Sequence, residues 1–98
     1  HKKNTWLILG MLNNKDLYNF LNQIKSFIAG VMAVKIPNEK NSFTTQDIFL
    51  TCKKLKIKCI KQKDIKSANQ HLLLSIKPER IIITGSLYLI GKARKLFV

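Results

Sequence analysis

The chain has 98 residues, of which 46% are hydrophobic and 23% charged, a composition typical of one soluble globular domain and not of a disordered segment. Lys and Arg outnumber Asp and Glu by 18 to 5, which gives a net charge of +13. The lysines are spread over nearly every segment, so we interpret the charge as solvated surface and expect no specific nucleic-acid partner. No apolar run approaches the ~20 residues of a membrane span, so we expect no membrane partner.

Strand and helix patterns alternate four times along the chain. Short runs of apolar and β-branched residues predict four strands, at residues 5–9, 31–36, 57–60 and 81–83. Apolar residues with helical spacing predict four helices, at residues 15–28, 45–55, 64–76 and 87–97. Thr44 or Thr45 is expected to cap the second helix, because Thr44-x-x-Asp47 is a near capping box. Glycine or proline stands at most of the other boundaries, at Gly10, Gly30, Pro37 and Pro78.

This βαβαβαβα order predicts an α/β fold, a three-layer Rossmann-like domain with a mainly parallel sheet. The strand order that we prefer is 3-2-1-4. It places the loop after the first strand (Gly10 to Lys15) beside the loop after the fourth strand (Thr84 to Ser86), where ligands bind in open α/β sheets. Because Ile81, Ile82 and Ile83 form an unbroken β-branched run, we expect the fourth strand to be buried on both faces.

The turn after the fourth predicted strand holds the best candidate for a ligand site. Gly85 lets the backbone turn without a Cβ clash, and Ser86 stands at the start of a helix. The Ser86 hydroxyl and the free N–H groups of the first helical turn can bind a carboxylate or a phosphate, but they equally suit a plain helix cap. Tyr88, one turn further on, either leans over the site or packs with its hydroxyl at the rim.

Lys15 and Asp16 follow the first strand and open the next helix. Lys15 can pair with a phosphate or carboxylate, or it can be solvated surface. Asp16, which we place in the first helical turn, can bind a cation or a ribose hydroxyl, or it can simply complement the helix dipole.

Motifs for other kinds of site are absent from the sequence. There is no G-x-x-x-x-G-K-[ST] and no G-x-G-x-x-G, so no self-contained nucleotide site is expected. No paired carboxylates and no Ser/His/Asp set are visible, and we interpret His71 as a surface histidine. Cys52 and Cys59 lack the spacing of metal ligands, so we expect two buried, reduced thiols.

Three segments carry a family resemblance. Residues 7–16 read L-I-L-G-M-L-N-N-K-D, residues 34–39 read V-K-I-P-N-E, and residues 84–91 read T-G-S-L-Y-L-I-G. The first and last resemble the strand-G-M-x-x-x-K-D and T/C-G-S-L-Y-L-x-G segments of the C-terminal domain of folylpolyglutamate synthase, which is often bifunctional with dihydrofolate synthase, in the Mur ligase superfamily. The middle segment is similar to the V-x-I-P-x-E stretch of some bacterial members. The resemblance covers essentially the whole chain.

The resemblance implies a Rossmann-like domain that closes over an ATP-binding P-loop domain. It implies ATP-dependent ligation of L-glutamate to a folate through an acyl phosphate, in the cytoplasm. ATP and Mg²⁺ would be bound mainly by the P-loop domain, with K⁺ assisting. Gly85, Ser86 and Tyr88 would contact glutamate, and Lys15 and Asp16 would lie on the interdomain or nucleotide side. No catalytic residue and no metal ligand is expected in this chain itself.

The family's D-G-A-H-N segment and its P-loop domain are not in this sequence, which begins at His1. We therefore interpret residues 1–98 as an excerpt, a C-terminal domain without its first strand–helix unit, and expect the isolated chain to be inactive. Two other functions stay open: a freestanding α/β binding or scaffold module left by a split or degenerate gene, and a basic nucleic-acid-binding domain. The second would need lysines and aromatic side chains interleaved on one face, whereas the phenylalanines look like core or loop anchors, at Phe20, Phe27, Phe43 and Phe49.

Overall fold

The structure is a computed structural model that describes residues 5–84. Residues 1–4 and 85–98, and with them the last predicted helix, lie outside the described part. In chain order the elements are β1 (Thr5–Leu9), α1 (Leu17–Ile24), the 3₁₀ helix η2 (Lys25–Phe27), β2 (Gly30–Ala33), α2 (Thr45–Lys54), β3 (Cys59–Lys61), α3 (Ile65–His71), the π-helical turn η3 (Leu72–Ile76) and β4 (Arg80–Thr84).

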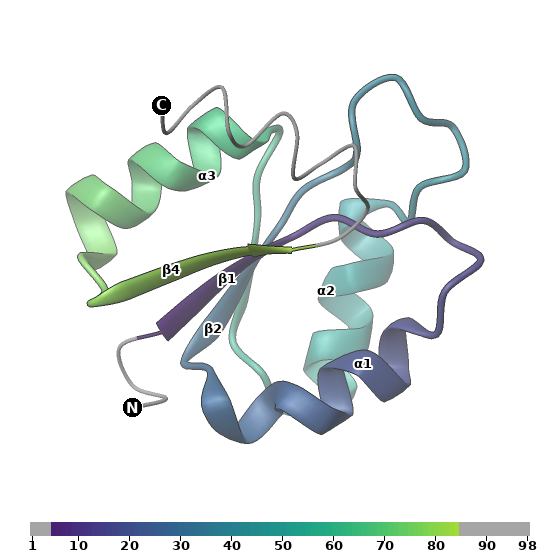
Figure 1. Cartoon of the computed structure of the whole chain (residues 1–98), viewed down its shortest axis with the longest axis horizontal. Coiled ribbons are helices and arrows are strands. Elements are labelled where there is room, and N and C mark those ends of the chain that lie inside the picture. Colours follow the sequence, from purple (N-terminus) through teal and green to yellow (C-terminus); the bar gives the residue numbers. More distant parts are fainter. Residues whose placement is uncertain (1–4, 85–98) are drawn as a thin grey trace.

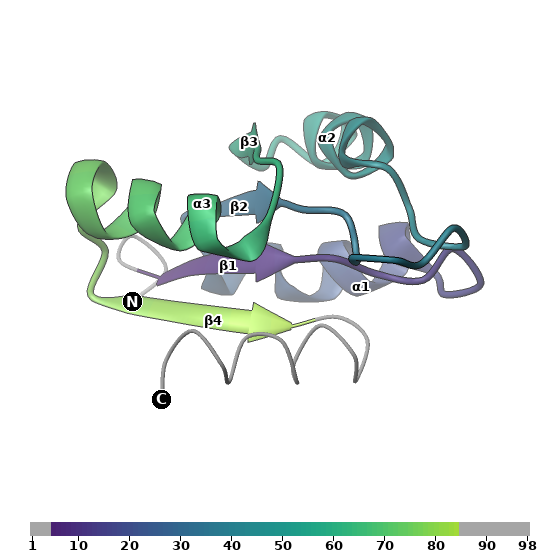
Figure 2. The same ribbon diagram turned by 90° about the horizontal axis from the view of Figure 1, so that it is seen from above.

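The strands form one parallel sheet in the order β3-β2-β1-β4, as Figure 2 shows from above. Leu7 of β1 lies between Val31 of β2 and Ile82 of β4 in the register. Helices cover both faces of the sheet, with α1 and α2 on one side and α3 on the other (Figure 1). The predicted α/β Rossmann-like fold and the predicted strand order are therefore confirmed.

Two separate cores lie on the two faces of the sheet, and side chains of the central strands alternate between them. The face toward α1 and α2 takes Leu7, Leu9, Val31 and Ala33, while the face toward α3 takes the intervening residues Trp6, Ile8, Met32 and Val34. Apolar helix residues with helical spacing are buried in these cores, at Leu17, Leu21, Ile48, Cys52, Ile65, Ala68 and Leu72. This alternation explains why β1 and β2 read as continuous apolar runs.

Gly30 is required by the close approach of β2 to a tryptophan. Trp6 of β1 lies opposite Gly30 in the register, and its indole ring covers the glycine backbone. A Cβ built on Gly30 would stand 2.5 Å from the nearest ring carbon of Trp6, which is well inside van der Waals contact. Gly30 therefore begins β2 and is not a break before it.

Several predicted boundaries are wrong by a few residues. The first helix begins at Leu17 and passes into η2, so it is shorter than the predicted 15–28; Ile28 is buried but extended, with φ −127° and ψ 150°. Strand β2 ends at Ala33, although Val34 and Ile36 stay buried beyond it. Strand β3 runs from Cys59 to Lys61 instead of over 57–60. In each case an apolar residue is buried by a turn or coil, and burial alone does not distinguish coil from a regular element.

The fourth strand is not buried on both faces, so that prediction is wrong. Ile81 and Ile83 pack into the core beneath α3, but Ile82 is 42% exposed on the opposite face. Among the described strands, β4 pairs only with β1. A groove separates β4 from α1, so α1 does not cover this face of β4. The unbroken run Ile81 to Ile83 therefore describes a strand with one buried face.

The helix starts follow the predicted capping chemistry. Thr44 Oγ1 accepts a hydrogen bond from the N–H of Asp47, and an Asp47 carboxylate oxygen accepts one from the N–H of Thr44, which completes the capping box of α2. Asp64 caps α3 by accepting from the N–H of Ser67 at 2.7 Å. That hydrogen bond holds the pKa of the Asp64 carboxyl below its usual value, with help from Lys63 and Lys66.

Candidate functional site

The carboxyl ends of β1 and β4 lie side by side at one edge of the sheet, as the predicted strand order requires. Leu9 pairs with Thr84 in the register, and the N–H of Gly10 donates to the carbonyl of Thr84 at 3.4 Å. Since both strands are parallel, each loop leaves the sheet at this edge. The first segment of the family resemblance, residues 7–16, therefore contacts Thr84, the residue with which the last segment begins.

The loop after β1 is also fixed to the loop after β2, a connection that the sequence did not predict. The Ser42 hydroxyl accepts from the N–H of Ile36 at 3.2 Å and lies 3.0 Å from the carbonyl oxygen of Phe43 and 3.5 Å from that of Met11. Two backbone bonds reinforce it, from the N–H of Asn13 to the Asn41 carbonyl at 2.7 Å and from the N–H of Phe43 to the Met11 carbonyl at 2.9 Å. Ser42 is one of two polar residues that are buried in the described part of the chain.

Lys15 and Asp16 lie at the end of the loop after β1, which these hydrogen bonds fix to the loop after β2. Asp16 is the N-cap of α1 and not a residue of its first turn, and its Oδ1 accepts from the N–H of Asn19 at 3.0 Å. The cap uses one carboxylate oxygen of Asp16 and leaves the side chain exposed. Lys15 is exposed, and its N–H donates to the Leu12 carbonyl at 3.2 Å, so its ammonium group projects from a fixed backbone.

The remaining predicted site residues, Gly85, Ser86 and Tyr88, lie outside the described residues. The structure places only Thr84, the residue that immediately precedes them, at the carboxyl end of β4. His71 ends α3 and is partly exposed.

A polar depression of about 640 Å³ lies beside these loops, between the segments that follow β2 and β3. Its lining carries three lysines and two acids: Lys35, Lys40, Lys63, Glu39 and Asp64. Both acids already accept backbone hydrogen bonds, Glu39 from the N–H of Asn41 and Asp64 from that of Ser67. Since three lysines face two acids, the net charge at this part of the edge is positive, which favours anionic ligands over cations.

The described residues, 5–84, do not fit an Mg²⁺ site. Within residues 5–84 no group of three or more His, Cys, Asp or Glu side chains lies close enough to hold a metal ion. Three of the carboxylates, those of Asp16, Asp47 and Asp64, are used as helix caps at three separate positions. Magnesium prefers carboxylate and phosphate oxygens gathered at one point, and the described chain does not gather them.

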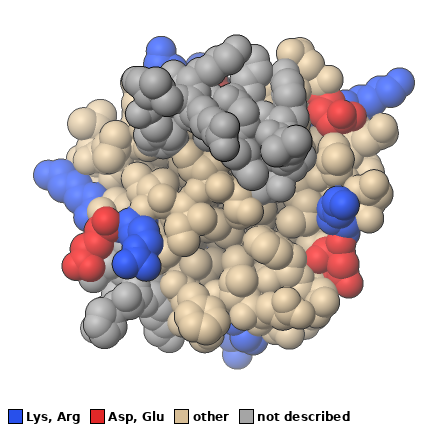
Figure 3. All heavy atoms as spheres, viewed as in Figure 1, with Lys and Arg blue, Asp and Glu red and all other residues tan. Residues whose placement is uncertain are grey.

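The charges do not gather into a patch on the face seen in Figure 3. Lys and Arg side chains lie at separate points around its rim, some of them beside acidic side chains, and its centre is uncharged. Of the phenylalanines expected to be anchors, Phe20 and Phe43 pack against the core, but Phe27 is 70% exposed, so that part of the expectation is wrong. Among residues 5–84 no helix has both the length and the apolar character that a membrane span needs.

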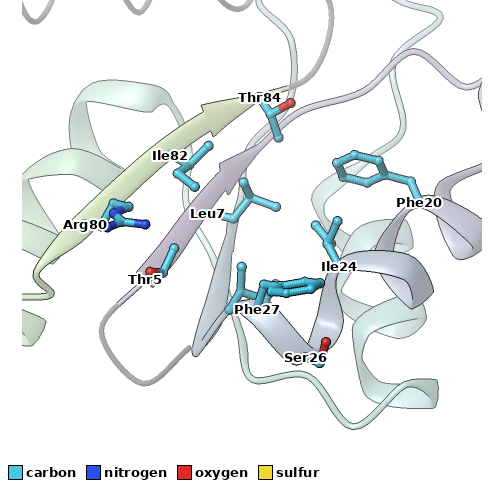
Figure 4. Close-up of a pocket in the computed structure, with 10 residues that line it drawn as sticks. Thr5, Leu7, Phe20, Ile24, Ser26, Phe27, Arg80, Ile82 and Thr84 are labelled. Carbon is cyan, nitrogen blue, oxygen red and sulfur yellow. The ribbon is translucent and has the colours of Figure 1, made fainter. Parts of the chain in front are cut away.

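A mainly apolar groove of about 420 Å³ runs along β4 on the α1 side of the sheet (Figure 4). Leu7 and Ile82 form its floor, and Phe20, Ile24 and Phe27 form the opposite wall. Polar groups lie along it at Thr5, Ser26, Arg80 and Thr84. The groove suits an apolar side-chain surface rather than a charged ligand, because its exposed area is largely hydrocarbon.

Comparison with solved structures identifies the fold. The chain superimposes on Mycobacterium tuberculosis folylpolyglutamate synthase complexed with ADP and AMPPCP with a TM-score of 0.78, over 99% of this chain and 24% of that one, at 17% sequence identity. The chain has the fold of one part of folylpolyglutamate synthase. The same enzyme complexed with ADP gives a TM-score of 0.75, over 97% of this chain and 24% of that one, at 14% identity.

The match is structural. No protein-family model matches the chain, and no curated protein matches it in sequence. The chain spans about a quarter of the length of the two folylpolyglutamate synthase chains.

Proposed function

We propose that this chain is the C-terminal domain of an ATP-dependent amide ligase that adds L-glutamate to a folate, a folylpolyglutamate synthase, with dihydrofolate synthase activity as a further option of the same enzyme. The observation that carries the proposal is the contact of Gly10 with Thr84. It joins, at one edge of a folylpolyglutamate synthase fold, the two segments that resemble that family's motifs. The fold alone would not support a ligase function, because folds of this class serve many functions. The proposal therefore depends on the fold and the motif resemblance together.

In this proposal the carboxyl edge holds the incoming glutamate. Gly85 and Ser86 follow Thr84 directly in the sequence, and Tyr88 comes two residues after Ser86, so these residues would contact the glutamate carboxylates. Lys15 and Asp16 would lie on the interdomain or nucleotide side, since Lys15 projects from a loop fixed on two sides. A positively charged edge supports the binding of an anionic substrate.

The partner of this domain would be the P-loop domain of the same enzyme, and the chain alone would be inactive. ATP and Mg²⁺, with K⁺, would be bound by that domain, because the described carboxylates are dispersed as helix caps. Folate and L-glutamate would be the substrates, and the enzyme would act in the cytoplasm.

The groove along β4 would be covered in the intact enzyme by the family's first strand–helix unit. Ile82 and Phe27 leave an apolar surface beside β4 that a packed helix would bury. The three quarters of the folylpolyglutamate synthase chains that this chain does not span include enough polypeptide to do so. A surface of this kind otherwise promotes association between copies of the chain.

The Ser86→Ala variant of the intact enzyme that carries this domain tests the assignment of glutamate to this edge. The loss of the hydroxyl should raise the Michaelis constant for glutamate and leave that for ATP unchanged, because only glutamate would contact Ser86. Misplacement of a reacting group by about 1 Å can lower the rate ~10²-fold. Ser75→Ala, at an exposed serine of η3, is the matched control and should change neither constant. If Ser86→Ala only lowers the melting temperature, the hydroxyl is a helix cap and the assignment fails.

The nucleic-acid alternative is tested by titration of the protein against a duplex and a single strand. We expect binding that weakens steeply as salt is raised and that is indifferent to sequence, because bulk charge binds by counterion release. Sequence-selective binding at physiological salt would instead make nucleic-acid binding the main function.

A further inference from the structure

The two cysteines lie together between α2 and the edge strand β3. Cys52, in the last turn of α2, is fully buried, and Cys59, at the start of β3, is half-buried; both are free thiols. The N–H of Ile57 donates to the Cys52 carbonyl at 2.8 Å, which folds the chain back at the end of α2. Ile57 and Cys59 both pack on the core that contains Cys52, which places the two thiols near each other.

A lysine ammonium group is positioned at the same helix–strand contact. Lys61 stands two residues after Cys59, on the same face of β3. Its Nζ donates to Oε1 of Gln46 at 2.9 Å and lies 5.2 Å from the centre of the Phe49 ring. Both partners belong to α2, so the positive charge of the exposed Lys61 side chain is held at the contact between α2 and β3.

These neighbours give the two thiols different protonation. The hydrogen bond from the Cys52 thiol lowers the pKa of Cys59 below its ordinary value, and the backbone N–H of Ala33 and the charge of Lys61 lower it further, against the opposing effect of burial. The same hydrogen bond raises the pKa of Cys52, as do burial and the charge on Cys59. A thiolate is the nucleophilic form of cysteine, so the accessible thiol is also the reactive one.

We propose that Cys59 is a site of oxidation by hydroperoxides and that Cys52 resolves the product into a reversible disulfide within the chain. This modification site is separate from the carboxyl edge and does not depend on the ligase function. The prediction of two buried, reduced thiols fits Cys52, whereas Cys59 is only partly buried and has a lysine at the same helix–strand contact.

The proposed oxidation of the two cysteines takes place in two steps. The Cys59 thiolate attacks one oxygen of the hydroperoxide, the O–O bond breaks, and the leaving oxygen takes a proton as water or an alcohol, so that Cys59 becomes a sulfenic acid while the peroxide is reduced. The Cys52 sulfur then attacks the Cys59 sulfur and loses its proton as the S–O bond breaks, and the hydroxyl leaves as water. Exchange with an external dithiol restores both thiols.

Hydrogen peroxide, applied to the full chain with dimedone present, tests the proposal by mass spectrometry. The native chain should lose two hydrogen atoms, keep no dimedone adduct and remain a single chain, with the Cys52–Cys59 peptide pair recovered after digestion. Cys52→Ala should accumulate the dimedone adduct at Cys59, because the resolving thiol is gone. Cys59→Ala should leave Cys52 unmodified while the chain stays folded. Dithiothreitol should reverse the change in the native chain.

Variants of Lys61 test whether the reactivity of Cys59 comes from the neighbouring positive charge or only from the exposure of its thiol. Lys61→Gln should slow the reaction of Cys59 with peroxide by roughly two- to tenfold, because a smaller fraction of the thiol is ionised. Lys63→Gln, which removes an exposed charge that is not among the groups acting on Cys59, should not slow it. Three results would each overturn the proposal: disulfides between chains, a Cys59 that reacts with peroxide no faster than glutathione does, or equal effects of the two lysine variants. The first two are measured on the unaltered chain, so they do not depend on the folding of a variant.

Discussion

Removal of the Ser42 hydroxyl should loosen the loops that form the candidate site. In Ser42→Ala the N–H of Ile36 loses its acceptor, and the Phe43 carbonyl loses its donor. Ile36 is 1% exposed and Ser42 5% exposed, so water cannot readily replace the lost partner. A buried donor left without a partner costs about 1–3 kcal/mol. We therefore expect the free energy of unfolding to fall by roughly 1.5–3 kcal/mol, a large part of the stability of a domain of this size.

The assay is urea unfolding of Ser42→Ala beside Ser75→Ala. Ser75 is exposed on η3, and its replacement should change the free energy of unfolding by no more than about 0.5 kcal/mol. Hydrogen exchange locates the effect, because the N–H groups of Asn13 and Phe43 bridge the same two loops and should lose protection in Ser42→Ala alone. Equal stability of the two variants, or unchanged hydrogen exchange at those amides, would show that the Ser42 hydroxyl does not hold the two loops together.

Three further outcomes are expected. Gly30→Ala should lower the free energy of unfolding by about 1–3 kcal/mol in urea unfolding, since the new methyl group clashes with the Trp6 indole; a loss below 0.5 kcal/mol would mean that the ring moves freely. Asp64→Asn keeps a cap acceptor but removes the titrating group. Because the pKa of Asp64 is lowered in the folded chain, the stability that its charge contributes should be present above the ordinary pKa of about 3.9 and should be lost as the pH falls through the lowered pKa. If the free energies of unfolding of the two proteins run parallel against pH, this reasoning is wrong. The isolated chain should self-associate through the β4 groove, and light scattering should show less association in Ile82→Glu; a clean monomer before the substitution would count against an uncovered surface.

The fold could be predicted because its signals are periodic and local. Each strand is a short apolar run, each helix start carries its own acceptor, and the Thr44–Asp47 capping box joins residues three apart. The alternation of these elements restricts the topology to a few parallel sheets, and the order 3-2-1-4 is one of them. The ends of α1 and β2 were missed because Ile28 and Val34 are buried outside regular elements.

The candidate site was predictable only in part, because its main contacts join distant residues. Ser42 reaches the Met11 carbonyl, 31 residues away, and an isolated serine in a polar loop gives no sign of such a partner. The exposure of Ile82 depends on which helices cover β4, which the run Ile81 to Ile83 does not encode. By contrast, the meeting of Gly10 with Thr84 follows from the strand order alone.

Ligase activity of the full-length protein tests the central claim most directly. The protein that carries this chain together with its P-loop domain is incubated with ATP, Mg²⁺, a folate and isotopically labelled L-glutamate, and the folate product is measured by mass spectrometry. The account predicts a folate that is heavier by one glutamyl residue, with one ADP formed for each bond and no product when glutamate or ATP is left out. A folded protein that binds ATP but forms no glutamylated folate would contradict it.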